Sequence, residues 1–150
     1  MTIWVDADAC PNAVKEILFR AATRAQIPVN FVANHYQRLP PSPYLAMIQV
    51  EQGFDVADDY IVLHVETDDL VITSDIPLAA EALEKSAQVM SARGEVYNQQ
   101  NIGQRLNMRD FMETMRSSAL EVGGGPAPLG PKDKQAFANA LDRYIAKHKP

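Results

Sequence analysis

Residues 2–11 carry the sequence TIWVDADACP, in which a short run of apolar and strand-forming residues leads directly into two acids and then a proline. The first four residues of this stretch predict a buried β-strand. Pro11 favours the first turn of a helix, where its missing N–H group costs nothing. Apolar residues then recur at helical spacing. The stretch therefore predicts a strand, a turn that holds Asp6 and Asp8, and a helix.

The rest of the chain repeats this alternation of strands and helices. Further strands are predicted at residues 29–33, 45–50 and 70–73, and at one or both of 89–91 and 95–97. Helices are predicted at residues 55–65, 78–86 and 103–121 and in the segment around Phe137, Leu141 and Ile145. Strands that alternate with helices in this way imply a mainly parallel sheet covered on both faces. We expect a single α/β domain over residues 1–150.

The composition is that of a globular protein. Its 150 residues are 47% hydrophobic and 22% charged, and they can bury one sizeable core. No apolar run is long enough to cross a membrane, and two acids stand where a signal peptide needs a basic start. Cys10 is the only cysteine, so no intrachain disulfide can form, and we expect a cytoplasmic protein without membrane contact. A net charge of −5 argues against a broad basic footprint for nucleic acid, although basic residues can still cluster locally.

Acids follow two of the predicted strands. Asp6 and Asp8 come after the first strand, and Asp75 comes after residues 70–73. The carboxyl ends of parallel strands meet at one edge of the sheet, where the sites of open α/β sheets form. Asp58 begins the helix that leads into the Asp75 strand, and that helix could start at either edge. Gathered carboxylates repel one another, and a hard cation with oxygen ligands removes the conflict. The acids therefore predict a site for Mg²⁺ or Mn²⁺, whereas one Cys and three scattered His form no zinc pattern.

Each acid also has a structural explanation. Asp8 could cap the helix that Pro11 opens, and Asp75 could cap the helix that begins near Pro77. Asp58 and its neighbour Asp59 could simply favour the positive end of a helix dipole. A shared site is favoured because these explanations do not predict two acids after one strand together with a third after another.

Other polar residues carry weaker predictions. Asp68 and Asp69 precede a strand and are expected to be solvated turn residues. Cys10 lies at a helix start, where the dipole would favour a thiolate, but a structural role or redox sensitivity is favoured over nucleophilic catalysis. Asn34 and His35 follow the second strand and could lie at the same edge as the acids. Lys15, Arg20 and Arg24 share the first predicted helix and are expected to solvate its face, whereas Arg93, Arg105 and Arg109 could contact phosphates. The glycines at 123–125 lack the pattern of a phosphate loop and suggest a mobile connection that could close over the site.

Three motifs carry a resemblance to a known family. They are VDADACP at residues 5–11, GFDVADDYI at 53–61 and VITSDIPLA at 71–79. Together they resemble the YaiI/YqxD family of uncharacterised bacterial proteins. The likeness extends through residues 123–126 to Phe137 and covers almost the whole chain.

The same motifs resemble, more distantly, those of the PIN-like nucleases. In that superfamily an Asp ends the first strand, an Asp-x-x-Ile element lies on a helix, and a Thr-x-Asp element ends a later strand. The matching residues here are Asp6, Asp58 with Ile61, and Thr73 with Asp75, and the additional acids are Asp8 and Asp55. The helical Glu of the PIN pattern has no obvious counterpart, and Glu51 is the nearest by order. The resemblance implies a three-layer Rossmann-like sandwich that holds Mg²⁺ or Mn²⁺ and hydrolyses RNA or DNA.

Three functions follow as hypotheses. The first is a metal-dependent nuclease that acts on RNA by preference. Its catalytic acids, which are also its metal ligands, are Asp6, Asp8, Asp58 and Asp75, and Asp55 is a further ligand. The second is a non-catalytic module that keeps the acidic crevice for a metal, a nucleotide or a protein partner. The third is a small-molecule phosphatase with the same metal chemistry. Resemblance in fold alone does not choose among them.

Overall fold

The computed structural model of the chain describes residues 1–53, 55–106 and 129–148. In this part of the chain, a single sheet is built from β1 (Ile3–Asp6), β2 (Val29–Ala33), β3 (Leu45–Gln49), β4 (Leu70–Ile72), β5 (Gln88–Met90) and β6 (Val96–Tyr97). The strand order is β3-β2-β1-β4-β5-β6, and only β6 runs antiparallel to its neighbour. The chain winds outward from β1 in one direction and from β4 in the other. The carboxyl ends of β1 and β4 therefore flank the topological switch point, where open α/β sheets place their sites.

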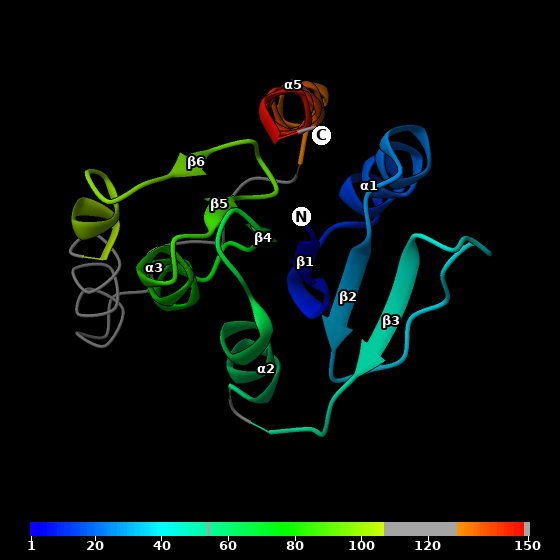
Figure 1. Ribbon diagram of the computed structural model, residues 1–150, viewed down its shortest axis with the longest axis horizontal. Coiled ribbons are helices and arrows are strands. Elements are labelled where there is room, and N and C mark those ends of the chain that lie inside the picture. The colour runs from blue at the N-terminus through cyan, green and yellow to red at the C-terminus, as the bar shows by residue number, and fades with distance from the viewer. Residues whose placement is uncertain (54, 107–128, 149–150) are drawn as a thin grey trace, which may run out of the picture.

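Helices cover both faces of the sheet. The helices are α1 (Asn12–Ala25), α2 (Val56–His64), α3 (Ile76–Glu84) and α5 (Pro131–His148), and a short 3₁₀ helix, η1 (Ala7–Ala9), follows β1. Helices α1 and α5 lie on one face, and α2 and α3 lie on the other (Figure 1). The prediction of an α/β fold with a mainly parallel sheet is thus confirmed. No helix among the described residues is both long and apolar enough to cross a membrane.

One predicted helix is only partly described. Residues 102–106 are helical, as expected for the start of the 103–121 segment. The remainder of that segment lies outside the described residues. The same is true of Arg109 and of the glycines at 123–125.

The core has two layers, one on each side of the sheet. Ile3 and Val5 of β1 pack toward α1 and α5, where Phe31 and Phe137 are fully buried. Trp4, between them in sequence, belongs to the opposite layer beneath α2 and α3. Because the central strands are buried on both faces, they appear in the sequence as uninterrupted apolar runs.

The register of the central strands sets the level of the candidate site. Val5 of β1 is paired with Ile72 of β4, so the next residues, Asp6 and Thr73, leave the sheet side by side. On the other flank, Asp6 is paired with Val32 of β2. The first acid of the motif thus ends the central strand between two parallel neighbours.

The opposite edge of the sheet holds a structural carboxylate. Asp69 is only 4% exposed, and its oxygens accept hydrogen bonds from Thr2 N at 2.9 Å, Trp4 Nε1 at 3.1 Å and Glu66 N at 2.9 Å. The expectation that Asp69 is a solvated turn residue is therefore wrong. Asp68 is exposed in a left-handed turn conformation, and its carbonyl accepts a hydrogen bond from the Tyr144 hydroxyl at 2.6 Å. Asp69 joins the starts of β1 and β4, which steadies the same two strands that carry the acids at their other ends.

Candidate functional site

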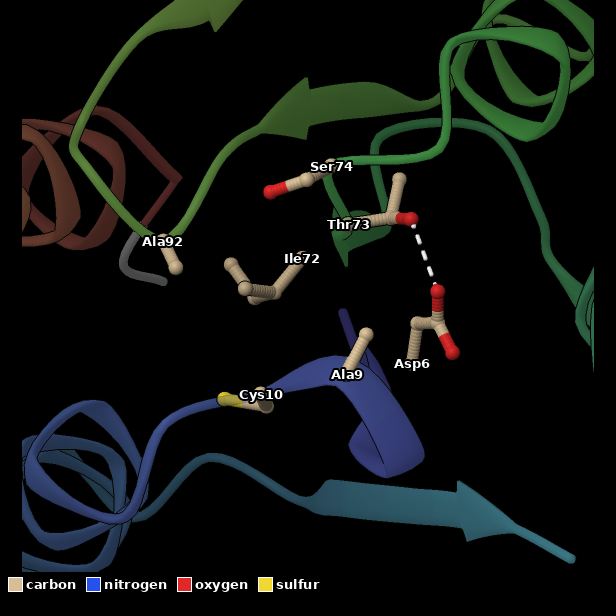
Figure 2. Close-up of a pocket in the computed structure, with 7 residues that line it drawn as sticks. All are labelled: Asp6, Ala9, Cys10, Ile72, Thr73, Ser74 and Ala92. Carbon is tan, nitrogen blue, oxygen red and sulfur yellow. Dashed lines mark hydrogen bonds between the residues drawn. The ribbon is translucent and has the colours of Figure 1, made fainter. Parts of the chain in front are cut away.

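Asp6 is held in place by Thr73 across the switch point. The Thr73 hydroxyl donates to Asp6 Oδ2 at 3.0 Å, as Figure 2 shows, and accepts from the Asp75 N–H group at 3.0 Å. Thr73 itself is buried at the end of β4. The hydroxyl therefore fixes the Asp6 carboxylate to the backbone of the Asp75 loop.

Asp75 caps α3, as one of its two interpretations predicted. Its Oδ1 atom accepts from the Leu78 N–H group at 3.1 Å, and Pro77 occupies the first turn of the helix. A cap of this kind typically stabilises a helix by about 1 kcal/mol. The capping bond uses one carboxylate oxygen, so the second interpretation, a role in a shared site, stays open.

Asp58 lies at the same edge of the sheet as Asp75. It is in the first turn of α2, and its carboxyl group shares a hydrogen bond with that of Asp75. Burial, the negative charges of Asp75 and Asp6, this bond and the charge of Asp55 raise the pKa of Asp58 to about 7. Helix α2 thus begins at the carboxyl edge, which the sequence left undecided.

The pKa of Asp6 is raised as well. The main cause is burial, which the hydrogen bond from Thr73 partly opposes. The negative charges of Asp75 and Asp8 raise this pKa further. The negative charges at this edge are therefore close enough to oppose the ionisation of Asp6 and Asp58.

Two hollows lie among these acids. The smaller, of about 10 Å³, lies between the ends of β1 and β4 and is lined by Asp6, Cys10, Thr73 and Ser74 among others (Figure 2). It has room for about one water molecule. The larger, of about 350 Å³, lies between the starts of α2 and α3 and has the acidic lining Asp55, Asp58, Asp59, Asp75 and Glu81. No described Lys or Arg lines either hollow, so the region, called here the acidic crevice, is strongly negative.

Asp8 lies on the other flank of Asp6. Its Oδ2 atom accepts from the Asn34 N–H group at 2.7 Å, which ties η1 to the residue after β2. The interpretation of Asp8 as the cap of α1 is wrong, because Pro11 precedes that helix and no side chain caps it. Asp8 is exposed and lines neither hollow. It contributes to the site through its charge on Asp6.

Cys10 lines the smaller hollow but is not a nucleophile in this structure. Burial, the largest cause, raises the pKa of the Cys10 thiol to about 12, although Lys15 lowers this pKa and Asp6 raises it. The expectation that a helix dipole would favour the thiolate is therefore wrong. At neutral pH the side chain is a protonated, half-buried thiol, which agrees with the structural role expected for it.

The possible ligand atoms suit a hard cation, because all of them are oxygens. They are the carboxylate oxygens of the acids and the Thr73 hydroxyl. Within residues 1–53, 55–106 and 129–148, however, no three Asp, Glu, His or Cys side chains are arranged to hold one ion in this conformation. The hydrogen bond between Asp58 and Asp75 needs a proton, and a cation at that point would replace it. Binding would therefore require the carboxyl groups to rotate.

The sequence analysis missed one acid of the crevice, Glu81. Glu81 lies on α3 at helical spacing from Asp75 and Leu78, and this spacing was the available signal. Glu51, the nearest match by order to the helical Glu of the PIN pattern, is an exposed loop residue between β3 and α2. His35 is also exposed.

Two of the candidate phosphate contacts form ion pairs instead. Arg93 Nη1 lies 2.6 Å from Asp133 Oδ2, and Arg105 Nη2 lies 2.5 Å from Glu95 Oε1. Both pairs involve the segment that follows β5, on the far side of the sheet from β2. Their positions argue for a structural role.

Two comparisons with known proteins, one with family models and one with individual proteins, both find matches over almost the whole chain. Residues 4–147 match the family described as "Uncharacterized BCR, YaiI/YqxD family". The chain is 62% identical over 147 residues to a UPF0178 protein of Saccharophagus degradans, covering 98% of this chain and 97% of that protein. It is 57% identical over 148 residues to a UPF0178 protein of Shewanella woodyi, covering 99% and 97% of the two chains. No solved structure matches the chain significantly. The chain belongs to the YaiI/YqxD family.

Proposed function

We propose that the protein is a divalent-metal-dependent phosphodiesterase that acts on nucleic acid, with RNA as the preferred substrate. One observation carries the proposal. Asp6, Asp58 and Asp75 come from three different elements and lie near one another at the switch point of the sheet, where the charge of Asp75 opposes the ionisation of both Asp6 and Asp58. Carboxylates with raised pKa values destabilise the fold at neutral pH. Their gathering at the carboxyl edge of a parallel sheet, where ligands bind in open α/β folds, is typical of a functional site.

In this proposal each acid of the crevice has its own role. A bound Mg²⁺ or Mn²⁺ ion would supply the Lewis acidity that phosphodiester hydrolysis needs. Thr73 fixes the orientation of Asp6, and the cap bond to Leu78 fixes that of Asp75. Asp58 would hold such a cation in its deprotonated form. Asp55 and Asp8 add negative charge on either side of these three residues.

A route through a covalent intermediate has less support. The Cys10 thiol is protonated at neutral pH because its pKa lies at about 12. No described His lines the hollows of the acidic crevice, so a His base is not at hand there. These features favour metal-dependent hydrolysis over nucleophilic catalysis by the protein.

The test is cleavage of labelled oligonucleotides by the full chain. Single-stranded RNA and DNA of mixed sequence would be incubated with Mn²⁺, with Mg²⁺ and with EDTA. We expect cleavage only with a divalent ion, faster on RNA, and a loss of about a hundredfold in Asp6→Asn. Glu84→Gln, at an exposed acid at the end of α3, is the matched control and keeps the wild-type rate.

The second candidate is a module that binds a metal without hydrolysis. It is favoured by the observation that no three described ligands converge on one point in this conformation. Calorimetry with Mn²⁺ separates the two candidates. Binding that Asp6→Asn weakens, without cleavage of any oligonucleotide, supports the module. Absence of both binding and cleavage rules out both functions.

A further inference from the structure

A second, basic groove runs along α1 on the opposite face of the sheet from α2 and α3. It consists of two hollows between α1 and residues 37–45, and the two share Phe19 as a wall. The first has a volume of about 300 Å³ and is lined by Lys15 and Arg38 among others. The second has a volume of about 420 Å³ and is lined by Arg20 and Arg24 among others. We call the two hollows together the α1 groove.

The charge of the α1 groove is opposite to that of the whole chain. Its walls carry four cations and a single acid, Glu16, although the protein has a net charge of −5. Lys15, Arg20 and Arg38 form no ion pair with any described acid. Among the described acids, Arg24 pairs only with the exposed Asp142, at 2.8 Å, and exposed pairs of this kind are weak. These charges are therefore available to an anionic ligand.

An aromatic ring stands between the two hollows. Phe19 is half-buried, and its ring centroid lies 5.5 Å from that of the fully buried Phe31 at a tilt of 57°. One side of the ring is thus fixed by the core while the ring still lines both hollows. Cations beside a fixed aromatic surface are the features that bind single-stranded nucleic acid, through phosphates and stacked bases.

The α1 groove ends beside the acidic crevice. Gln37 in its wall donates from Nε2 to the carbonyl of Ala7, the residue after Asp6, at 3.1 Å. Lys15 lies one helical turn after Pro11, to whose carbonyl its N–H group donates at 3.1 Å, and Cys10, the residue before Pro11, lines the smaller hollow of the crevice. The Oε1 atom of Gln37 is buried and receives no hydrogen bond from the described residues.

We propose that the α1 groove binds a single strand of nucleic acid and leads it to the acidic crevice. Phosphates contact Lys15, Arg20 and Arg38, and a base stacks on Phe19. From Lys15 to Arg24 the helix rises about 13 Å, the length of about four stacked nucleotides. An unpaired strand is required because a paired base cannot reach the ring. Binding stands on the groove alone, whereas delivery to the crevice rests on the proposed function.

The experiment measures the affinity of the full chain for fluorescein-labelled oligouridylate of twelve residues, in EDTA and at several salt concentrations. The double variant Arg20→Glu/Arg38→Glu is expected to bind more than tenfold more weakly. The slope of log affinity against log salt should fall by about 0.7 for each phosphate contact that is lost. Phe19→Leu keeps an apolar side chain against Phe31 and should weaken binding about tenfold through lost stacking. Circular dichroism checks that each variant is folded.

The matched control is Lys132→Glu/Lys134→Glu. It makes the same change in net charge in the exposed first turn of α5, away from the α1 groove, and should bind like the wild type. Equal losses in both double variants would mean that only overall charge matters, and would overturn the proposal. So would equal affinity for a duplex of the same length, or for polyglutamate.

Cleavage assays separate this proposal from the proposed function. If the wild type binds through the groove but cleaves nothing with Mn²⁺, the proposed function fails and the groove remains a binding site. If the groove variant cleaves the twelve-residue substrate as fast as the wild type at limiting substrate, the groove fails and the nuclease stands. If both hold, the groove variant loses activity on that substrate through KM but cleaves a dinucleotide normally.

Discussion

Asp6 and Asp69 carry the same side chain at opposite edges of the sheet. Asp6 ends β1 and Asp69 precedes β4, and the two carboxylates have different partners. Asp69 accepts three hydrogen bonds, including one from the indole of Trp4, and has no described acid among those partners. Asp6 accepts one, from Thr73, and faces the charges of Asp75 and Asp8. A carboxylate with three donors stabilises the fold, whereas one that faces like charges destabilises it unless a cation is bound.

Asp69→Ala should therefore be strongly destabilising. It leaves the N–H groups of Thr2, Trp4 and Glu66 buried or half-buried without an acceptor, at a cost of about 3 kcal/mol. Urea denaturation measures the loss, and Trp4, the only tryptophan, reports it by fluorescence. Asp68→Asn is the control, because asparagine tolerates the left-handed conformation of residue 68 and the backbone carbonyl to which Tyr144 bonds remains. A similar loss in both variants would contradict the role assigned to the Asp69 carboxylate.

Residue roles of this kind were poorly predictable because their partners are distant in sequence. Asp69 looks like a turn acid, and its indole partner lies 65 residues away. The Asp75 cap was predictable, since the acceptor and donor are three residues apart. The burial of Cys10, which raises its pKa, likewise depends on tertiary packing.

At the scale of elements, the hairpin of β5 and β6 supports α5 through a glycine. Gly94 has φ +82°, a value that favours glycine, and a Cβ atom there would lie 2.5 Å from the backbone C and O atoms of Ala136. The turn and the first half of α5 are therefore in direct backbone contact. Since α5 covers the layer around Phe137, this contact helps to close the core.

Gly94→Ala should separate the hairpin from α5. Because neither backbone can shift cheaply, we expect a loss of about 2–3 kcal/mol in the free energy of unfolding, from strain and overpacking. Gly103→Ala is the matched control: nothing lies within 4 Å of its Cβ position, and it should leave stability unchanged or raise it by up to about 1 kcal/mol. Thermal unfolding of both variants measures these differences in stability. If Gly94→Ala were as stable as the wild type, the close contact would not exist in solution.

The elements themselves were largely predictable. Buried strands appear as apolar runs, so β2 was predicted at its observed bounds and β1, β3 and β4 within a residue or so. The sequence allowed one or two strands around Gly94, and the structure has both. The edge at which α2 starts was not predictable, because the path of residues 50–55 from β3 depends on the sheet order. That edge decides whether Asp58 meets Asp75.

At the scale of the whole molecule, the strand order puts acids and cations on two separate surfaces, which the hydrogen bond from Gln37 to the Ala7 carbonyl links. The acidic crevice lies at the ends of β1 and β4 and between the starts of α2 and α3, and the α1 groove lies beside α1 on the other face. The sequence predicted the first from the rule that parallel strands end at one edge. It did not predict the second, because Lys15, Arg20 and Arg24 face residues 37–45, whose path over α1 no local pattern specifies.

The acidic crevice should also set how the stability of the metal-free protein depends on pH. The pKa of Asp58 is about 7 in the folded chain and near 3.8 without the fold, so between these values the folded state binds more protons than the unfolded state. This group's contribution to stability is therefore full below about pH 4 and is lost as the pH rises through 7. The raised pKa of Asp6 acts in the same direction.

Asp58→Asn tests this directly in EDTA. The amide cannot ionise, so at pH 8 the variant should be more stable than the wild type by about 1 kcal/mol, after allowance for solvent screening, or about 2–4 °C in Tm. At pH 4 the difference should vanish, because the wild-type carboxyl is then protonated as well. Glu84→Gln, at an exposed acid that lines neither hollow of the crevice, is the control and should change little at either pH. Adding Mn²⁺ at pH 8 should stabilise the wild type more than Asp58→Asn. Equal stability of wild type and variant at pH 8 would show that the carboxylates do not oppose one another, and would remove the observation on which the metal site rests.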